Sequence, residues 1–308
     1  MTLQQLEYIV AIDKYRHFNH AAESCGVTQS TLSSLVMKLE QELDITIFDR
    51  NSHPVRPTEA GEAVLNQAKV VLFNARQLQE MSRTERQQAS GSIRMSVTPT
   101  IAPYLVPGMF RYLNEHYPDV KMHAFEHYRE DVVAKLKRAE IDMAIMAMPQ
   151  KEPDLLEIPL YRERLMAYVA PECPVYNQLE VDTMTMPDDK LWCLREETRL
   201  LPQIPELVMD GPVYTSRYEA GNLATLIRIV EETGGMTVVP ELYTFNMRKD
   251  YCNNLRPLVN PVPVREVSLF VRRDYVRERM ANIVVEAVKS IIPDKMIDER
   301  LKKYDIRL

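Results

Sequence analysis

The chain contains 308 residues, of which 45% are hydrophobic and 27% are charged, and its formal net charge is −6. This is the composition of an ordinary soluble protein with room for two or three domains. No apolar stretch reaches transmembrane length, and the first residues lack the basic-then-apolar order of a signal peptide. A membrane-spanning or secreted protein is therefore not expected, and the cytoplasm is the default location.

The cysteines exclude two further classes of protein. Cys25, Cys173, Cys193 and Cys252 are far apart, form no CxxC pair and have no histidine partners at ligand spacing. This pattern argues against both a disulfide framework and a zinc site. We expect reduced and mostly buried thiols.

Residues 18–43 predict two short helices joined by a tight turn. Ala21 and Ala22 allow a neighbouring helix to approach the first helix closely, and Gly26 falls where that helix must end. The second helix places apolar residues at helical spacing on one side: Leu32, Leu35, Val36, Leu39 and Leu43. Its other side carries a polar ridge of Ser30, Ser34 and Lys38, four residues apart. Because a helix-turn-helix lays such a ridge into the major groove, DNA binding is the first hypothesis.

A small wing and a long helix are predicted next. Short apolar stretches flank residues 51–54, and Arg50 and Arg56 in this hairpin are cations suited to contact phosphates. Thr58 is a predicted N-cap, with acidic residues in the first turn that follows. Alternating spacings of four and three, as in a coiled-coil seam, relate Val64, Ala68, Val71, Ala75 and Leu78. Packing against its own domain is the alternative, but the length of the helix favours a dimer seam.

The charge of the N-terminal segment predicts a modest electrostatic contribution to DNA binding. Up to Thr58, Lys and Arg do not outnumber Asp and Glu. A protein that binds DNA by bulk charge would be more basic. We therefore expect a few placed contacts, doubled by two-fold symmetry, with a moderate salt dependence and a low affinity for the isolated head.

From Ile93 onward, strands alternate with helices. The predicted strands cover residues 93–97, 120–125, 141–146, 165–170, 191–194, 236–240 and 266–272, and the predicted helices cover 104–113, 129–139, 223–231 and 276–291. This alternation predicts an α/β fold with two doubly wound lobes, between which the chain crosses twice. A cleft between such lobes is a usual site for a small ligand.

The expected domains follow from these patterns. A winged helix-turn-helix occupies residues 1–58, a dimerising linker helix 59–89 and an effector-binding domain 90–308. The first lobe of that domain comprises about residues 92–162 and 267–308, and the second comprises about residues 163–266.

The chain from residue 1 to about 290 resembles a LysR-type transcriptional regulator, and more closely the OxyR-like branch of hydrogen peroxide-inducible genes activators. The resemblance rests on LEY at residues 6–8, TQSTLS at 28–33, KLE at 38–40, FDR at 48–50, TEAG at 58–61, TPTIAPYLVP at 98–107 and GMTVVP at 235–240. It implies a winged helix-turn-helix, a linker helix and a two-lobed domain like a periplasmic binding protein. It further implies a homodimer or homotetramer that acts with RNA polymerase on promoter DNA.

The resemblance also implies which residues contact DNA. Gln29, Ser30, Thr31, Ser34 and Lys38 would face bases or nearby phosphates, because Gln can pair with adenine and Lys with guanine in the major groove. The wing cations Arg50 and Arg56 would hold the backbone. For any single one of these residues, a solvated helix face is the alternative.

The resemblance breaks at the effector site. The OxyR mechanism needs a low-pKa thiolate that peroxide oxidises and a second thiol that resolves it. Alignment of the strand around Cys193 puts Arg199 at the position of the reactive cysteine, Thr198 at that of its neighbouring histidine and Val208 at that of the resolving partner. Cys193 itself falls inside a predicted strand, as a core thiol. A different effector is therefore expected.

An anionic effector is one hypothesis. Arg129 stands where a hydroxyl-bearing residue of the peroxide pocket is expected, whereas Thr100 is kept. If Arg199 and Arg129 reach the cleft beside Thr98 and Thr100, they suit a small anion such as a carboxylate, which Arg binds bidentately. Asn222, at the start of a helix in the second lobe, is a further polar candidate. The alternative is that both arginines are surface ion-pair partners.

Three other functions stay open. One is a redox-responsive activator that uses Cys193 or another thiol. The second is an enzyme, which is disfavoured because the sequence contains no nucleophile–base pair, metal set or phosphate loop, and only His123 and His127 lie near each other in a possible cleft. The third is a ligand-binding or scaffolding protein without DNA function, which the intact polar ridge disfavours. We expect a non-enzymatic regulator without a metal or cofactor.

Overall fold

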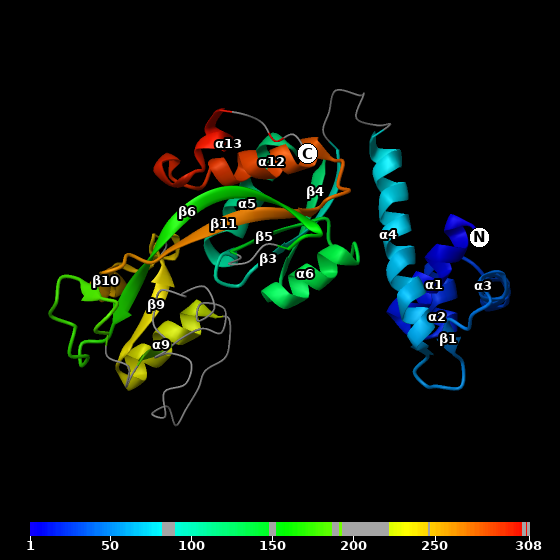
Figure 1. The fold of residues 1–308 in the computed structure, drawn as a ribbon, viewed down its shortest axis with the longest axis horizontal. Coiled ribbons are helices and arrows are strands. Elements are labelled where there is room, and N and C mark those ends of the chain that lie inside the picture. The colour runs from blue at the N-terminus through cyan, green and yellow to red at the C-terminus, as the bar shows by residue number, and fades with distance from the viewer. Residues whose placement is uncertain are drawn as a thin grey trace. The chain divides into compact units, whose positions relative to one another are not determined.

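The computed structural model describes residues 1–81, 90–147, 152–186, 191–192, 222–245, 247–303 and 306. The chain divides into two compact units, of which unit 1 is Met1–Gln87 with Arg138–Glu140 and unit 2 is Gln88–Lys137 with Ile141–Leu308. Unit 1 contains the predicted winged head and linker helix, and unit 2 contains the predicted lobes (Figure 1).

Unit 1 begins with three helices and a small sheet. These elements are α1 (Leu3–Tyr15), α2 (Phe18–Ser24), α3 (Gln29–Leu43), β1 (Phe48–Asp49) and β2 (Arg56–Pro57). Thr2 and Gln5 form a capping box at the start of α1. Gly26 has a φ of 67° in the turn before α3, which confirms its predicted role. Thr28 caps α3 by accepting a hydrogen bond from Thr31 N at 3.2 Å.

The apolar side of α3 forms the core of the head. Leu32, Val36 and Leu39 are fully buried, as the spacing predicted, and they belong to one cluster with Ile9 of α1. The following helix α4 (Glu59–Met81) adds buried residues to the same cluster. Burial of this side leaves the opposite side of α3 to the polar residues.

The start of α4 is held tightly against the wing. Thr58 Oγ1 accepts a hydrogen bond from Gly61 N at 2.9 Å, which confirms the predicted N-cap. A Cβ atom at Gly61 would lie 2.0 Å from Ile47 O, so only glycine permits this approach of backbone to backbone. The first turn of α4 thereby packs backbone to backbone against Ile47, the residue before the wing strand β1.

The predicted dimer seam begins on the head's own core. Ala68 is buried, and Val64 and Val71 are half-buried against the same cluster as α3. Leu78, farther along, is 70% exposed. The first part of α4 therefore packs within its own domain, which was the alternative to a dimer seam. The dimer seam stays a prediction for the later part of the helix.

Unit 2 contains a nine-stranded mixed sheet. Its main path is β4-β3-β5-β11-β6-β10-β7, and β9 pairs with both β6 and β8. The strands are β3 (Gly91–Val97), β4 (Val120–Glu126), β5 (Met143–Ala147), β6 (Leu155–Val169), β7 (Val181–Asp182), β8 (Leu191–Trp192), β9 (Met236–Pro240), β10 (Leu255–Val259) and β11 (Val264–Arg272). The helices are α5 (Ala102–His116), α6 (Arg129–Lys137), α9 (Leu223–Thr233), α10 (Glu241–Thr244), α11 (Lys249–Cys252), α12 (Glu278–Lys289), a 3-10 turn at Asp294–Met296 and α13 (Glu299–Lys303).

Two long antiparallel strands, β6 and β11, run from one lobe to the other (Figure 1). The first lobe contains β3, β4 and β5, and β5 pairs with β11. The second lobe contains β9 and β10, which pair with the end of β6. This arrangement confirms the two-lobed α/β domain.

Some predicted elements differ from the observed ones. The strand predicted from residue 165 begins ten residues earlier, at Leu155, because Pro159 at the irregular register of β6 and β11 interrupts the apolar pattern. The final long helix begins at Glu278 rather than residue 276. Strand β10 and helix α13 were not predicted. No described helix is long and apolar enough to cross a membrane.

The described thiols are less uniformly buried than expected. Cys173 is buried and Cys25 is half-buried, but Cys252 is exposed at the end of α11. The expectation of a mostly buried thiol was therefore wrong for Cys252. Cys193 lies outside the described residues.

Candidate DNA-binding surface and interlobe cleft

Helix α3 presents the predicted DNA-contacting residues together. Gln29, Ser30, Thr31, Ser34 and Lys38 are all exposed, on the helix whose other side fills the core of the head. Within the described part of the chain, the side chains of Gln29, Ser34 and Lys38 take part in no hydrogen bond or ion pair. Their polar groups are thus available to an external partner.

The first turn of α3 contains a cluster of three hydroxyls. Thr28 Oγ1 lies 3.0 Å from Ser30 Oγ and 2.8 Å from Thr31 Oγ1. This cluster lies at the helix N-terminus, where the helix dipole favours an anion such as a phosphate. The hydroxyls of Ser30 and Thr31 are each within hydrogen-bond distance of Thr28 Oγ1.

Arg50 is held by the head itself. Its Nη2 donates to Glu40 Oε2 at 2.8 Å, and its guanidinium lies 5.4 Å from the centre of the Phe18 ring. The other oxygen of Glu40 accepts hydrogen bonds from Ile47 N and Phe48 N at 2.8 and 3.3 Å. Glu40 thereby fixes the start of the wing against α3. Glu40 belongs to the KLE stretch of the resemblance, but its role at the wing was not predicted from the sequence.

Arg56 has a different environment from Arg50. It pairs in register with Asp49 across the wing, and its backbone N donates to Ser52 Oγ at 3.0 Å. Its side chain is exposed and forms no ion pair with any described residue. Arg56 is therefore the wing cation that can reach a phosphate without breaking an internal contact.

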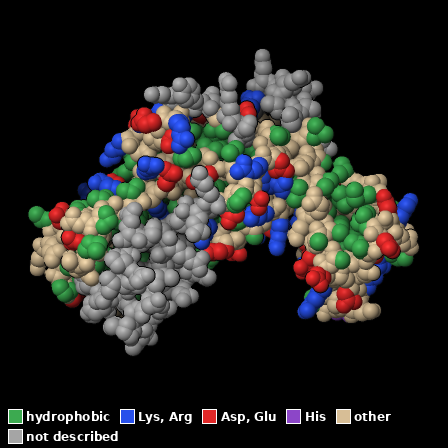
Figure 2. All heavy atoms as spheres, viewed as in Figure 1, with side chains coloured by type: hydrophobic (Ala, Val, Ile, Leu, Met, Phe, Trp, Pro, Cys, Tyr) green, Lys and Arg blue, Asp and Glu red, His purple; other side chains and the backbone are tan. Residues whose placement is uncertain are grey.

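A buried glutamine also positions α3. Gln5 is 4% exposed, and its Nε2 donates to Leu35 O at 3.2 Å, which joins α1 to α3. Lys69 of α4 pairs with Asp13 of α1 at 2.9 Å. On the visible face of the head, acidic and basic side chains are interspersed (Figure 2), in agreement with the modest electrostatic contribution expected from the composition.

A second candidate site is a cavity of about 550 Å³ in unit 2. Its described lining comes from both lobes: Pro99, Pro103, Glu126, His127, Tyr128 and Asp131 from the first, and Asn222, Leu223, Ala224 and Tyr243 from the second. A cavity of this size between two lobes is typical of small-ligand sites.

The effector residues expected from the sequence do not all reach this cavity. Asn222 lines it, while its Oδ1 caps α9 by accepting bonds from Ala224 N and Thr225 N. Thr98 and Thr100 are almost fully buried and are not in the lining.

Of the predicted arginines and Thr198, only Arg129 lies among the described residues. Arg129 is absent from the described lining and pairs with Glu130 at 3.6 Å, as the surface ion-pair alternative stated. Thr198, Arg199 and Val208 lie outside the described residues.

The described lining is acidic rather than basic. It contains the carboxylates of Glu126 and Asp131 but no Lys or Arg. His127 Nδ1 lies 3.0 Å from the hydroxyl of buried Ser96. From the sequence, His127 is only a weak catalytic candidate, and Tyr128 and Tyr243 are not predicted to line a site. Aromatic residues in helical or loop segments carry no distinct sequence signal for a ligand site.

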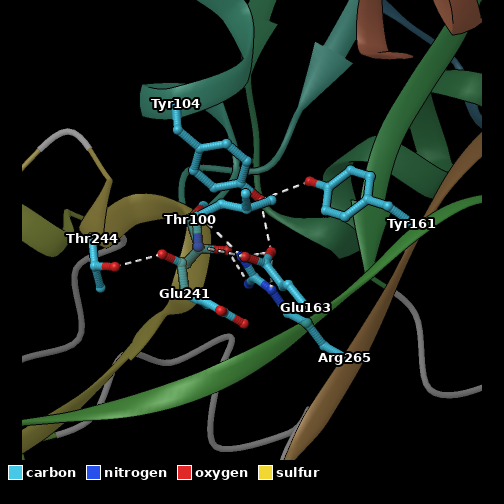
Figure 3. Close-up of polar contacts among 8 residues, drawn as sticks. Thr100, Tyr104, Tyr161, Glu163, Glu241, Thr244 and Arg265 are labelled. Carbon is cyan, nitrogen blue, oxygen red and sulfur yellow. Dashed lines mark hydrogen bonds and ion pairs between the residues drawn. The ribbon is translucent and has the colours of Figure 1, made fainter. Parts of the chain in front are cut away.

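A buried polar network joins α5, β6 and β11 (Figure 3). Glu163 and Arg265 form an ion pair at 2.9 Å, with side chains that are 0% and 1% exposed. Tyr104 donates to Glu163 Oε1 at 2.7 Å, and Tyr161 lies 2.7 Å from the Tyr104 oxygen. Burial, and then the neighbouring Glu163 charge, hold the pKa of Tyr104 and of Tyr161 well above the usual range. Both phenols are therefore neutral donors.

Metal chemistry finds no support in the described residues, among which no group of three or more His, Cys, Asp or Glu side chains is arranged to hold an ion.

Comparison with known families agrees with both parts of the structure. Residues 3–62 match the family described as "Bacterial regulatory helix-turn-helix protein, lysR family", and residues 86–291 match the family described as "LysR substrate binding domain". The chain belongs to the LysR family. The matched ranges correspond to the winged head with the start of α4 and to the two-lobed domain.

Full-length relatives are similar to this LysR-family chain. A "Hydrogen peroxide-inducible genes activator" of Haemophilus influenzae is 31% identical over 305 residues, covering 95% of this chain and 99% of the relative. The "DNA-binding transcriptional dual regulator OxyR" of Escherichia coli K12 is 29% identical over 304 residues, covering 98% and 99%. A full-length OxyR structure from Pseudomonas aeruginosa superposes with a TM-score of 0.80 at 29% identity, covering 97% and 98%. These similarities confirm an OxyR-like transcription regulator.

Proposed function

We propose that this regulator recognises promoter DNA through one side of α3. In this proposal Gln29, Ser34 and Lys38 contact base edges in the major groove, while Ser30 and Thr31 contact phosphate at the helix N-terminus. The observation that carries the proposal is the separation of α3 into a buried apolar side and an exposed polar side, on which Gln29, Ser34 and Lys38 have no hydrogen-bond or ion-pair partner among the described residues. Arg50 and Arg56 complete the backbone contacts from the wing.

Lys38→Ala tests this assignment. A good base contact contributes about 1–3 kcal/mol, so specific affinity should fall by roughly tenfold or more while non-specific affinity changes little. Lys14→Ala is the matched control, because Lys14 is an exposed cation on α1 of the same head. Fluorescence anisotropy with operator and random DNA measures both affinities. Equal losses for the two variants would contradict a base contact and leave only bulk charge.

We further infer that the effector is a small polar ligand of neutral or positive charge that binds in the interlobe cavity. The carboxylates of Glu126 and Asp131 support this charge, and the aromatic rings of Tyr128 and Tyr243 provide apolar surface beside them. An anionic effector would depend on Arg199. Peroxide sensing by a disulfide would need a pair of reactive thiols, and the resemblance puts Arg199 and Val208 at the family's positions for them.

A ligand in this cavity would contact both lobes. Its binding would therefore favour one lobe arrangement over another and shift a population of oligomers that differ in operator spacing. A homodimer or homotetramer that changes spacing in this way can alter contact with RNA polymerase. This is the regulatory scheme that we propose.

Probe molecules of different charge test the effector class. Binding of agmatine, glucose, benzoate and hydrogen peroxide to the full-length protein can be followed by calorimetry. We expect a cationic or neutral probe to bind, and Asp131→Asn to weaken a cationic one by about tenfold. Glu130→Gln is the control, because Glu130 lies on the same helix outside the described lining. Binding of benzoate alone would refute the assigned charge, and a footprint altered by peroxide would support the redox alternative through Cys193.

A further inference from the structure

The buried pair Glu163–Arg265 lies where β6 and β11 pass between the lobes. The two residues face each other in the register of these strands. Arg265 Nε donates to Glu163 Oε1 at 2.9 Å, and both side chains are excluded from solvent. At this pair, the two long strands that join the lobes lie side by side.

Arg265 is also bonded to the first lobe, and Glu163 is bonded to both lobes (Figure 3). Arg265 donates to Thr100 through Nη1 to the side-chain oxygen at 2.9 Å and through Nη2 to the carbonyl at 3.3 Å, in the first lobe. Glu163 Oε2 accepts from Leu242 N at 3.1 Å, in the first turn of α10 in the second lobe. Tyr104 of α5 donates to the other oxygen of Glu163.

Such a pair is a poor source of stability, because desolvation of two charges offsets most of their attraction. Its hydrogen bonds are directional, however, and all of them can be made together only at one arrangement of Thr100, Leu242 and the two strands. We propose that Glu163 and Arg265 form an interlobe clamp, whose bonds to Thr100 and Leu242 hold the two lobes at one angle. Both are positioning residues, which act on the angle between the lobes through Thr100 and Leu242.

A ligand in a neighbouring cavity can act on the clamp through Tyr104. The ring of Tyr104 lines a second cavity, of about 270 Å³, together with Tyr243 and Tyr251. A ligand that moves this ring would displace the hydroxyl that donates to Glu163. Only this link to a ligand rests on the proposed function, and the clamp itself does not.

The same two strands offer a matched control. Arg162 and Glu266 form an ion pair at 2.7 Å in the neighbouring register, with side chains that are 72% and 35% exposed. Exposed pairs of this kind contribute little. Glu266→Gln therefore removes a charge and an ion pair from the same strands without touching the clamp.

Hydrogen exchange of the full-length protein, resolved by mass spectrometry, tests the clamp. Glu163→Gln replaces one acceptor oxygen of the carboxylate by an amide group that donates. A buried hydrogen-bonding group is then left unpaired, so exchange at residues 98–104 and 240–245 should become roughly tenfold faster. In Arg265→Lys, the lysine ammonium cannot bond to Glu163 and Thr100 together as the guanidinium does. Exchange should therefore become faster at residues 98–104 and remain slow at residues 240–245. Glu266→Gln should change neither segment.

Two results would overturn the clamp. One is a Glu163→Gln protein whose exchange at both segments equals that of Glu266→Gln. The other is uniformly faster exchange throughout unit 2, β3 and β9 included, because the pair would then act on global stability alone. Exchange needs no ligand, so absence of probe binding would refute the proposed effector site while leaving this result standing.

Discussion

Substitution of Gly61 by alanine should destabilise the winged head, although alanine is the better helix former. Gly61 lies in the first turn of α4, where alanine would ordinarily add about 1 kcal/mol of helix stability. Here the added Cβ would lie 2.0 Å from Ile47 O, a distance that real Cβ contacts essentially never show, so the two backbones must move apart.

The wing cannot give way freely at this point. Ile47 O already accepts from Thr58 N at 3.0 Å, and Ile47 N donates to Glu40. Overpacking costs about 1–3 kcal/mol and a lost hydrogen bond about 1 kcal/mol, against a gain of about 1 kcal/mol from propensity. We therefore expect a net loss of about 1–3 kcal/mol in the free energy of opening the head.

Hydrogen exchange of α1–α3 peptides in the full-length protein measures this free energy, and operator anisotropy measures its effect on DNA binding. Gln67→Ala is the control, because it places alanine at an exposed position of the same helix without a new contact. It should be neutral or slightly stabilising. A Gly61→Ala protein whose head is as stable as that of the parent would refute the argument from close approach.

Three further predictions concern other sites. Glu40→Gln should raise the operator Kd about tenfold in anisotropy titrations, because it weakens the hydrogen bonds to Ile47, Phe48 and Arg50. An unchanged Kd would show that DNA binding does not depend on the attachment of the wing by Glu40. Asn222→Ala should destabilise α9 by about 1 kcal/mol in hydrogen-exchange experiments, whereas Asn222→Asp should retain the N-cap. An equal loss of helix stability in both variants would argue against capping by this side chain. The hydrogen bond to Glu286 raises the pKa of Tyr117 from 10 to about 12, so its contribution to stability is complete below pH 10 and is lost as pH rises through 12. Urea unfolding of Tyr117→Phe should accordingly depend less on pH between 10 and 12, and an identical pH dependence would refute the assignment.

Periodic and capping signals made most of the fold predictable. The apolar spacing of α3, the turn at Gly26 and the N-cap at Thr58 are local features, and each was confirmed. The alternation of strands and helices correctly indicated two α/β lobes, because each element carries its own hydrophobic pattern. The early part of β6 was missed where Pro159 and an irregular register hide that pattern.

The contacts that position the candidate sites were harder to predict, because they join residues distant in sequence. Glu40 reaches the wing, Gln5 reaches α3, and Glu163 pairs with Arg265 across 102 residues. A solvated carboxylate and a buried one look alike in a single sequence. Arg129 illustrates the reverse problem, since its charge suits an anionic ligand but its described ion pair is with its neighbour Glu130.

A footprint of the full-length protein on DNA upstream of its own gene, taken under reducing conditions and after peroxide, tests the central claim most directly. We predict a specific protected site that is lost in the double variant Gln29→Ala with Ser34→Ala and is unchanged in length by peroxide. A site protected equally by the double variant would contradict recognition by α3, and a footprint that shifts or shortens on oxidation would show that a thiol is the sensor.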